Sequence, residues 1–169
     1  MFFLGCHLVD LIYRIQGKPE RVYALNKATG VDGVFTEDFG TAILEYPRGV
    51  SFVRTSGVER GGFRRRQLVV VGTEGTWEIN PLEWGGEPAI VTSRRISTDK
   101  KWRAMGEDSQ TPPFDRYREM LLHFARCVRG EQENEFTPDS ELEVYKLLLR
   151  CCGETALTDS NAEQTTAEE

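Results

Sequence analysis

Two residues near the start of the chain, His7 and Asp10, carry side chains that could exchange a proton with a substrate. They are three positions apart, so on a helix they share one face. An imidazole titrates near neutral pH and suits proton transfer with a hydroxyl or carbonyl group, while Asp10 would orient His7 or contact the substrate. The same spacing also fits a polar residue near a helix start beside a solvated carboxylate. Spacing alone leaves both interpretations open.

The pattern around this pair predicts the element that positions it. Over residues 5–16 apolar residues recur at helical spacing, and Gly17 followed by Pro19 ends the helix. The period then changes to two, which predicts strands over residues 21–28, 41–46, 50–58, 65–71, 76–79 and 89–96. Short turns rich in glycine and proline join most of these segments, so successive strands should pair antiparallel. A long polar loop is expected over residues 97–112.

Two further helices are predicted, over residues 114–128 and from Thr137-Pro138 to Gly153. The predicted order along the chain is one helix, then several strands, then two helices, and this order predicts an α+β fold. We expect a largely antiparallel, open-faced sheet of five or six strands with helices on one face. Residues 1–153 should form this domain, and the acidic tail 154–169 should be disordered.

The predicted strands carry apolar residues on both faces, although helices are available for one face only. In residues 65–71, for example, Val69 and Val71 alternate with Leu68 and Val70. The uncovered face either meets a second copy of the chain or lies under the 97–112 loop with its Trp102 and Met105. The first alternative is favoured and predicts a homo-oligomer.

Composition excludes several classes of protein. A net charge of -6 argues against nucleic acid as the main partner, and no run of residues has the length of a membrane span. The cysteines lack metal-type spacing and fit buried, reduced thiols, so no metal site is expected and the cytoplasm is the expected compartment. On a strand, Arg65 would point away from Arg64 and Arg66, which favours pairing with nearby acids over a phosphate site.

Several segments, in this order, resemble the C-terminal domain of the glucose–fructose oxidoreductase / inositol dehydrogenase (Gfo/Idh/MocA) family. The resemblance covers residues 3–153 and rests on these stretches: Gly5-Cys6-His7-Leu8-Val9-Asp10-Leu11, Gly17-Lys18-Pro19-Glu20-Arg21-Val22, residues 38–46, residues 71–79, residues 124–131 and residues 148–153.

The resemblance implies an oxidoreductase of two domains that uses NAD or NADP. A Rossmann domain, in cis or in trans, would hold the dinucleotide, and this domain would bind a sugar, inositol or related polyol and build the oligomer through its open sheet. Hydride would pass between nicotinamide and substrate while a proton moves through a histidine, which His7 matches. Asp10 matches the acidic residue of the same motif and would contact the substrate.

Two departures from the family pattern bear on this expectation. Phe3 stands where the family usually has an aspartate, one helical turn before the histidine, and its side chain cannot hydrogen-bond a hydroxyl or an imidazole. No GxGxxG fingerprint occurs in these residues, so no cofactor-binding residue is assigned and the chain alone should be inactive. We therefore expect one of two alternatives. The chain is either the substrate-binding and oligomerisation half of such an oxidoreductase, present as a fragment, a truncated gene product or a split subunit, or a binding or scaffold module that has lost the chemistry and self-associates through its open sheet.

Overall fold

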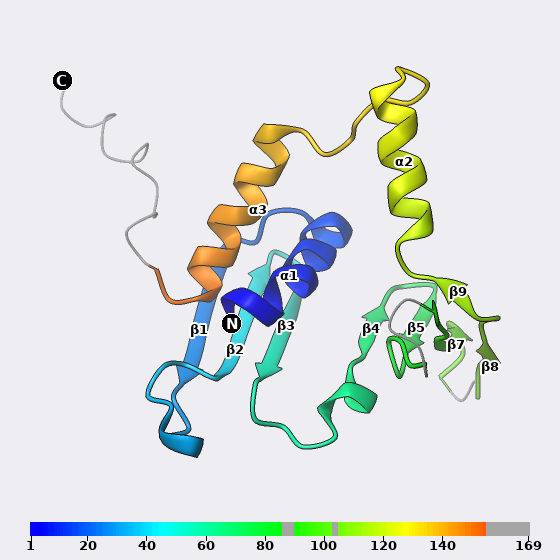
Figure 1. The fold of residues 1–169 in the computed structure, drawn as a ribbon. Helices are drawn as coiled ribbons and strands as arrows, with labels where there is room; N and C mark the ends of the chain where they lie inside the picture. Colours follow the sequence, from blue (N-terminus) through cyan, green and yellow to red (C-terminus); the bar gives the residue numbers. More distant parts are fainter. Residues whose placement is uncertain (86–89, 103–104, 155–169) are drawn as a thin grey trace, which may run out of the picture. The chain divides into compact units, whose positions relative to one another are not determined.

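The computed structural model describes residues 1–85, 90–102 and 105–154. The chain forms two compact units, one made of Met1–Glu59 with the segment from Phe136 onward, the other of Arg60–Glu135 (Figure 1). The domain predicted over residues 1–153 thus contains two units. The predicted tail, apart from Glu154, lies outside the described residues.

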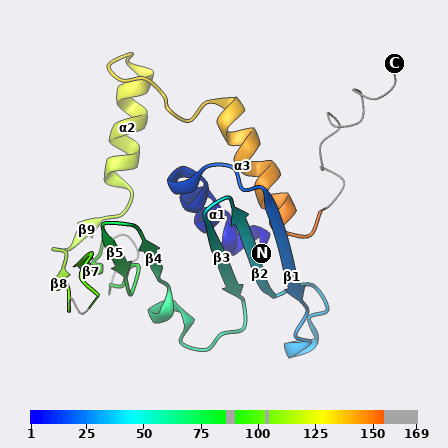
Figure 2. The same cartoon turned by 180° about the vertical axis from the view of Figure 1, so that it is seen from behind.

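The first unit is a three-stranded antiparallel sheet with two helices on one face (Figure 1). Seen from behind, the strands stand in front of both helices (Figure 2). The strand order is β1-β2-β3, with Ala42 opposite both Ala24 and Val53. A tight turn at Pro47-Arg48 joins β2 to β3, whereas a longer segment with a 3-10 turn joins β1 to β2. In chain order the elements are α1 (Phe2–Gln16), β1 (Arg21–Lys27), a 3-10 turn (Val31–Gly33), β2 (Phe39–Tyr46), β3 (Gly49–Ser56) and α3 (Pro138–Cys151).

The core of this unit lies between the helices and the inner face of the sheet. α1 supplies Val9, and the strands supply alternate residues, as a half-buried sheet requires. The buried cluster consists of Val9, Ala42, Leu44, Val53, Leu147, Leu148 and Cys151. Gly5 is also buried. A Cβ added there would clash with the Met1 sulfur and would lie 3.4 Å from Cγ2 of Thr55, so the missing side chain lets Met1 and β3 approach α1 closely.

Local sequence signals explain where these helices begin and end. Gly17 ends α1 with a φ of 74°, a conformation that glycine adopts without steric cost, and its N–H donates to the Tyr13 carbonyl at 2.7 Å. α3 starts at Thr137, whose Oγ1 accepts from the Ser140 N–H at 3.2 Å, and Pro138 fills the first turn.

The outer face of the three-stranded sheet bears no helix of this unit (Figure 2). The register aligns its side chains in rows across the strands, one of them Tyr23, Ile43 and Phe52. Phe52 is 73% exposed and Val50 64%, whereas Val53 on the inner face is 3% exposed. The predicted contrast between a covered and an uncovered face is confirmed for β3.

The second unit holds a four-stranded antiparallel sheet of order β4-β5-β7-β8 and a two-stranded one formed by β6 and β9. Among its described residues only Val91 and Ser93 are buried. In chain order its elements are a 3-10 turn (Gly62–Arg65), β4 (Leu68–Val71), β5 (Gly75–Ile79), β6 (Ile90–Val91), β7 (Arg94–Asp99), β8 (Glu107–Gln110), β9 (Phe114–Asp115) and α2 (Arg118–Val128).

The α+β class with open antiparallel sheets is confirmed, but the strands divide among three sheets where one of five or six strands is expected. The strand predicted over 65–71 begins only at Leu68, because residues 62–65 form a 3-10 turn after Gly61, whose φ is 68°. The strand predicted over 89–96 is interrupted at Thr92 and Ser93, because Thr92 pairs with Trp84 and the Ser93 hydroxyl donates to the Leu82 carbonyl.

The predicted polar loop over 97–112 is wrong in part, since it contains the end of β7 and the whole of β8. The sequence pattern does not reveal β8, because its four residues are polar and all their side chains are exposed. Trp102 is 98% exposed and Met105 92%, so these two side chains cover no sheet face.

Both C-terminal helices differ in detail from the prediction. Residues 114 and 115 pair with β6, so α2 starts at Arg118, and the described structure shows no buried residue on it. α3 lies over the inner sheet face through Leu147, Leu148 and Cys151, which leaves Leu142 and Tyr145 half exposed. The Tyr145 ring packs edge-on against the Phe2 ring, with 6.1 Å between the two ring centres.

Candidate functional site

His7 lies on the solvent-facing side of α1 and is exposed. Within the described part of the chain, no hydrogen bond or ion pair joins its imidazole to another residue. Gly5 and Val9, on the opposite side of the helix, are buried against the sheet. The packing of α1 therefore presents His7 outward, where both ring nitrogens are available to a ligand.

Asp10 does not orient His7 in this structure. Both of its carboxylate oxygens accept from Nε of Arg14, at 2.9 and 3.0 Å, one helical turn further along α1. The Arg14 guanidinium also lies 4.4 Å from the centre of the Phe136 ring and 3.6 Å from a carboxylate oxygen of Glu141. Asp10 thus belongs to a group that ties α1 to the start of α3.

A hollow of about 320 Å³ opens beside the first turn of α1. Phe3, which is 87% exposed, lines it one turn before His7. Its other lining residues are Met1, Phe2, Leu4, Glu37, Asp38, Thr55, Gly57 and Cys152. The wall is mixed, with apolar side chains from α1 facing two carboxylates.

One of the two carboxylates that line this hollow, Asp38, is engaged in structural contacts. The backbone N–H and the hydroxyl of Thr29 donate to Asp38, at 2.8 and 2.6 Å, and these bonds hold the pKa of Asp38 below its usual value. Burial raises the pKa of the Cys152 thiol, and it raises that of Cys151 to about 12. Both thiols are therefore protonated at neutral pH and are poor nucleophiles.

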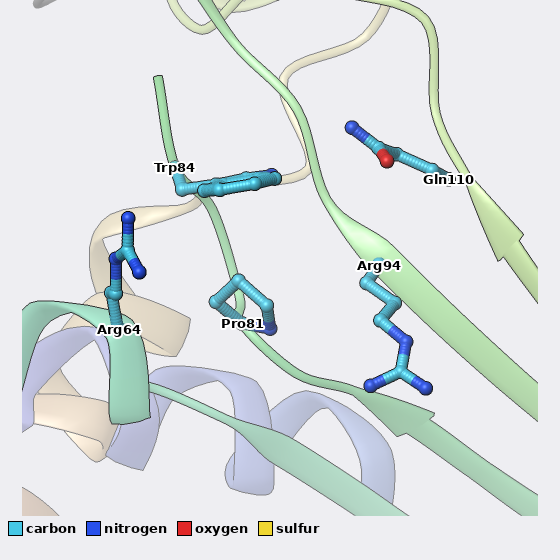
Figure 3. A pocket seen from close by; sticks show the side chains of 5 residues that line it. All are labelled: Arg64, Pro81, Trp84, Arg94 and Gln110. Atoms are coloured by element: carbon cyan, nitrogen blue, oxygen red, sulfur yellow. The ribbon is translucent and has the colours of Figure 1, made fainter. Parts of the chain in front are cut away.

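A second hollow, in the other unit, holds about 240 Å³ and is lined by Arg64, Pro81, Trp84, Arg94 and Gln110. Figure 3 shows the Trp84 ring and Pro81 between the two arginines, with Gln110 on the far side. We call it the arginine–indole pocket. The sequence analysis misses it because a strand would have split the arginine run, whereas the 3-10 turn directs Arg64 toward Trp84.

The expected pairing of the arginine run is confirmed for Arg66. It donates to Glu83 at 2.9 Å, and Arg116 donates to the other oxygen of the same carboxylate at 2.7 Å. The Glu83 carboxylate, which directly precedes Trp84 in the chain, is thereby held between two guanidinium groups.

The described residues do not fit a dinucleotide. Every pair of strands is antiparallel, so the parallel βαβ unit that cradles a pyrophosphate is absent from the described part of the chain. The described residues also contain no group of three or more side chains able to hold a metal ion. No helix within them is long and apolar enough to cross a membrane.

A known protein family matches the first part of the chain. Residues 1–78, which contain α1, His7 and the whole three-stranded sheet, match the GFO/IDH/MocA C-terminal domain. These residues belong to that family. No curated protein sequence matches the chain.

Solved structures extend the likeness in fold beyond the matched residues. A Klebsiella pneumoniae protein described as an oxidoreductase superposes with a TM-score of 0.66 at 22% identity, over 90% of this chain and 46% of its own. A Desulfitobacterium hafniense protein described as an NADPH-dependent oxidoreductase superposes with a TM-score of 0.62 at 16% identity, over 87% of this chain and 43% of its own.

The WlbA dehydrogenase from Bordetella pertussis, solved with NADH and UDP-GlcNAcA, gives a TM-score of 0.50 at 19% identity, over 88% of this chain and 40% of its own. The chain thus spans less than half the length of each of these three structures.

Proposed function

We propose that this GFO/IDH/MocA domain is the substrate-binding and oligomerisation part of an NAD(P)-dependent oxidoreductase that acts on a sugar, an inositol or a related polyol. The observation that carries the proposal is the placement of His7. It lies exposed on α1, inside the segment that matches the family, with its imidazole unengaged by described residues.

His7 would transfer the proton at the substrate oxygen. As the hydroxyl is oxidised, a ring nitrogen would take the O–H proton, and in the reverse direction it would return it. Asp10, held by Arg14, would keep the charge of this helix surface fixed and would contact the substrate from the same face.

The dinucleotide would be held by a domain other than those described here, in cis or in trans. Similar folds with NADH or NADPH in their descriptions, from Bordetella pertussis and Desulfitobacterium hafniense, support this cofactor class. The nucleotide sugar acid in the description of the first supports a sugar-like substrate. The free thiols of Cys151, which is buried, and of Cys152 support a reducing compartment such as the cytoplasm.

Self-association would use the outer face of the three-stranded sheet, with a second copy of the chain as the partner. The middle of this face is apolar, formed by Tyr23, Leu25, Ile43, Val50 and Phe52. The charged side chains around it are paired within the chain, because Arg21 lies 3.7 Å from Glu45 and Arg54 lies 3.4 Å from Glu59. A copy related by a two-fold axis would bury the apolar middle of one face against that of the other.

The test of the catalytic role is a His7→Ala substitution in an assembly that includes a dinucleotide-binding domain. We expect kcat to fall by roughly 10²–10⁴-fold, the range for a lost general acid–base, with the Kd for NAD(P)H unchanged. His123→Ala, on α2, is the matched control and should retain kcat. Full turnover by the His7→Ala protein would refute the role.

A second candidate function is a scaffold module without chemistry. Phe3 favours it, because an exposed phenyl ring stands one turn before His7 where the family pattern has a carboxylate. Turnover by any assembly containing this chain would exclude the module, whereas self-association without turnover in the presence of a dinucleotide domain would support it.

A further inference from the structure

The arginine–indole pocket has walls fixed by backbone hydrogen bonds. Trp84 and Thr92 exchange two, at 2.9 and 2.8 Å, and the N–H of Asn80 donates to the Arg94 carbonyl at 3.0 Å. The hydroxyl of Ser93, which is 5% exposed, donates to the Leu82 carbonyl at 2.7 Å. The segment that carries Pro81 and Trp84 is thus bound to the start of β7, so the pocket is formed before any ligand arrives.

The charge in the pocket is unbalanced. Arg94 is neutralised by Asp108, whose carboxylate accepts from its Nε at 3.0 and 3.1 Å. Arg64 contacts the Trp84 ring, with 5.7 Å from its guanidinium carbon to the ring centre, and has no carboxylate partner among the described residues. One positive charge therefore remains in a chain whose net charge is -6.

The other residues that line the pocket indicate what kind of group an anionic ligand could carry. Trp84 and Pro81 offer apolar faces against which a ring can lie. The side-chain amide of Gln110 donates to the Thr92 hydroxyl at 3.3 Å, which leaves its oxygen as an acceptor. A volume of about 240 Å³ lies below the roughly 300–1,000 Å³ of sites for drug-sized ligands, so a single ring fits better than a larger molecule.

We propose that the arginine–indole pocket binds a small oxyanion carried on a single ring, with the oxyanion on Arg64 and the ring against Trp84 and Pro81. Carboxylate and phosphate share this chemistry, because a guanidinium pairs with either through two parallel hydrogen bonds. The site is independent of His7 and of the proposed oxidoreductase role.

Proton–nitrogen NMR of the full chain tests the proposal through the indole N–H of Trp84, identified by its loss in Trp84→Phe. The probes are benzoate and phenyl phosphate, with benzamide as the uncharged analogue and acetate and inorganic phosphate as anions without a ring. We expect a saturable shift with at least one ring-bearing anion and binding of benzamide weaker by about ten-fold or more. The tighter of the two ring-bearing probes identifies carboxylate or phosphate as the ligand group.

Two variants separate the pocket from general surface charge. Arg64→Gln should weaken the binding of the better probe by about ten-fold, while Arg60→Gln, which removes a positive charge outside the lining, should change it by less than about two-fold. Equal weakening by both variants, equal affinity for benzamide, or no saturable shift with either ring-bearing anion would overturn the proposal. The benzamide comparison uses the unmodified chain and holds even where a variant fails to fold.

Discussion

Arg14 forms an ion pair with Asp10 across one turn of α1. The Nε of Arg14 lies 2.9 and 3.0 Å from the two carboxylate oxygens of Asp10. The pair that spacing suggests, His7 with Asp10, is therefore replaced by Asp10 with Arg14. His7 is exposed, and no carboxylate among the described residues holds its ring.

Asp10→Asn should lower the free energy of unfolding by only about 0.5 kcal/mol. Both side chains are about a third exposed, at 35% and 33%, so solvent screens the pair, and helix pairs at this spacing contribute little. Urea unfolding at low salt and in 1 M NaCl measures the effect, and the difference between the two proteins should shrink in high salt. A salt-independent loss above about 2 kcal/mol would contradict the assignment of a screened pair.

Phe52→Asp should weaken self-association, because it places a charge in the middle of the apolar outer face of the three-stranded sheet. Sedimentation velocity over a range of concentrations measures it. Phe35→Asp is the matched control, since Phe35 is 86% exposed but lies outside the sheet, and it should leave self-association unchanged. The interface hypothesis fails if the unmodified chain stays monomeric at high concentration.

Val71→Asp tests the same hypothesis on β4, where Val71 is 77% exposed and Val69 47%. Weakened self-association is expected if this strand also lies in an interface between copies, since a buried unpaired carboxylate is costly. The same sedimentation series measures it. An unchanged mass distribution would confine the interface to the first unit.

Glu83→Gln should lower the stability of the second unit by about 1–3 kcal/mol, because it leaves two arginines without their shared carboxylate. Glu83 is 17% exposed, so solvent compensates little. Glu74→Gln is the control, because Glu74 is 81% exposed and meets Lys100 at 3.3 Å, and its loss should cost less than about 0.5 kcal/mol. If denaturant unfolding gave the same loss of stability for Glu83→Gln and Glu74→Gln, Glu83 would not stabilise the second unit more than an exposed carboxylate does.

Cys151 should make the fold less stable in alkali. Burial raises the pKa of its thiol to about 12, above the value of roughly 8.5 in an unfolded chain. The folded state therefore keeps its proton where the unfolded state loses it, and stability present below about pH 8.5 declines as pH rises toward 12. The loss should approach about 1.4 kcal/mol per pH unit between these values.

The measurement for Cys151 is urea unfolding at pH 8 and pH 10 for the unmodified chain and for Cys151→Ala. The variant is less stable at both values because it leaves a cavity, but its stability should fall less between them. Parallel declines in the two proteins would show that another group causes the alkaline loss.

Local sequence patterns determined much of the first unit. Alternating apolar residues identified β1, β2 and β3, and the Gly17 stop and the Thr137-Pro138 start marked the ends of α1 and α3. These signals succeed because short turns and caps act within a few residues of chain. The order of segments also identified the family, which the match over residues 1–78 confirms.

The second unit was predicted less well because its elements are short and polar. β8 carries only exposed residues, and Thr92 and Ser93 interrupt a run that reads as one strand because Trp84 and Leu82, about ten residues earlier, hydrogen-bond to them. Such pairings depend on distant segments and leave no local pattern.

The sequence by itself therefore determined the α+β class, the family and His7 as the candidate for proton transfer. Only the tertiary structure decided that Asp10 binds Arg14, that Arg64 faces Trp84 and that the strands divide into three sheets. The physical reason is that spacing along the chain fixes which side chains share a face. Which partner a charged group takes depends on the packing of residues far apart in sequence.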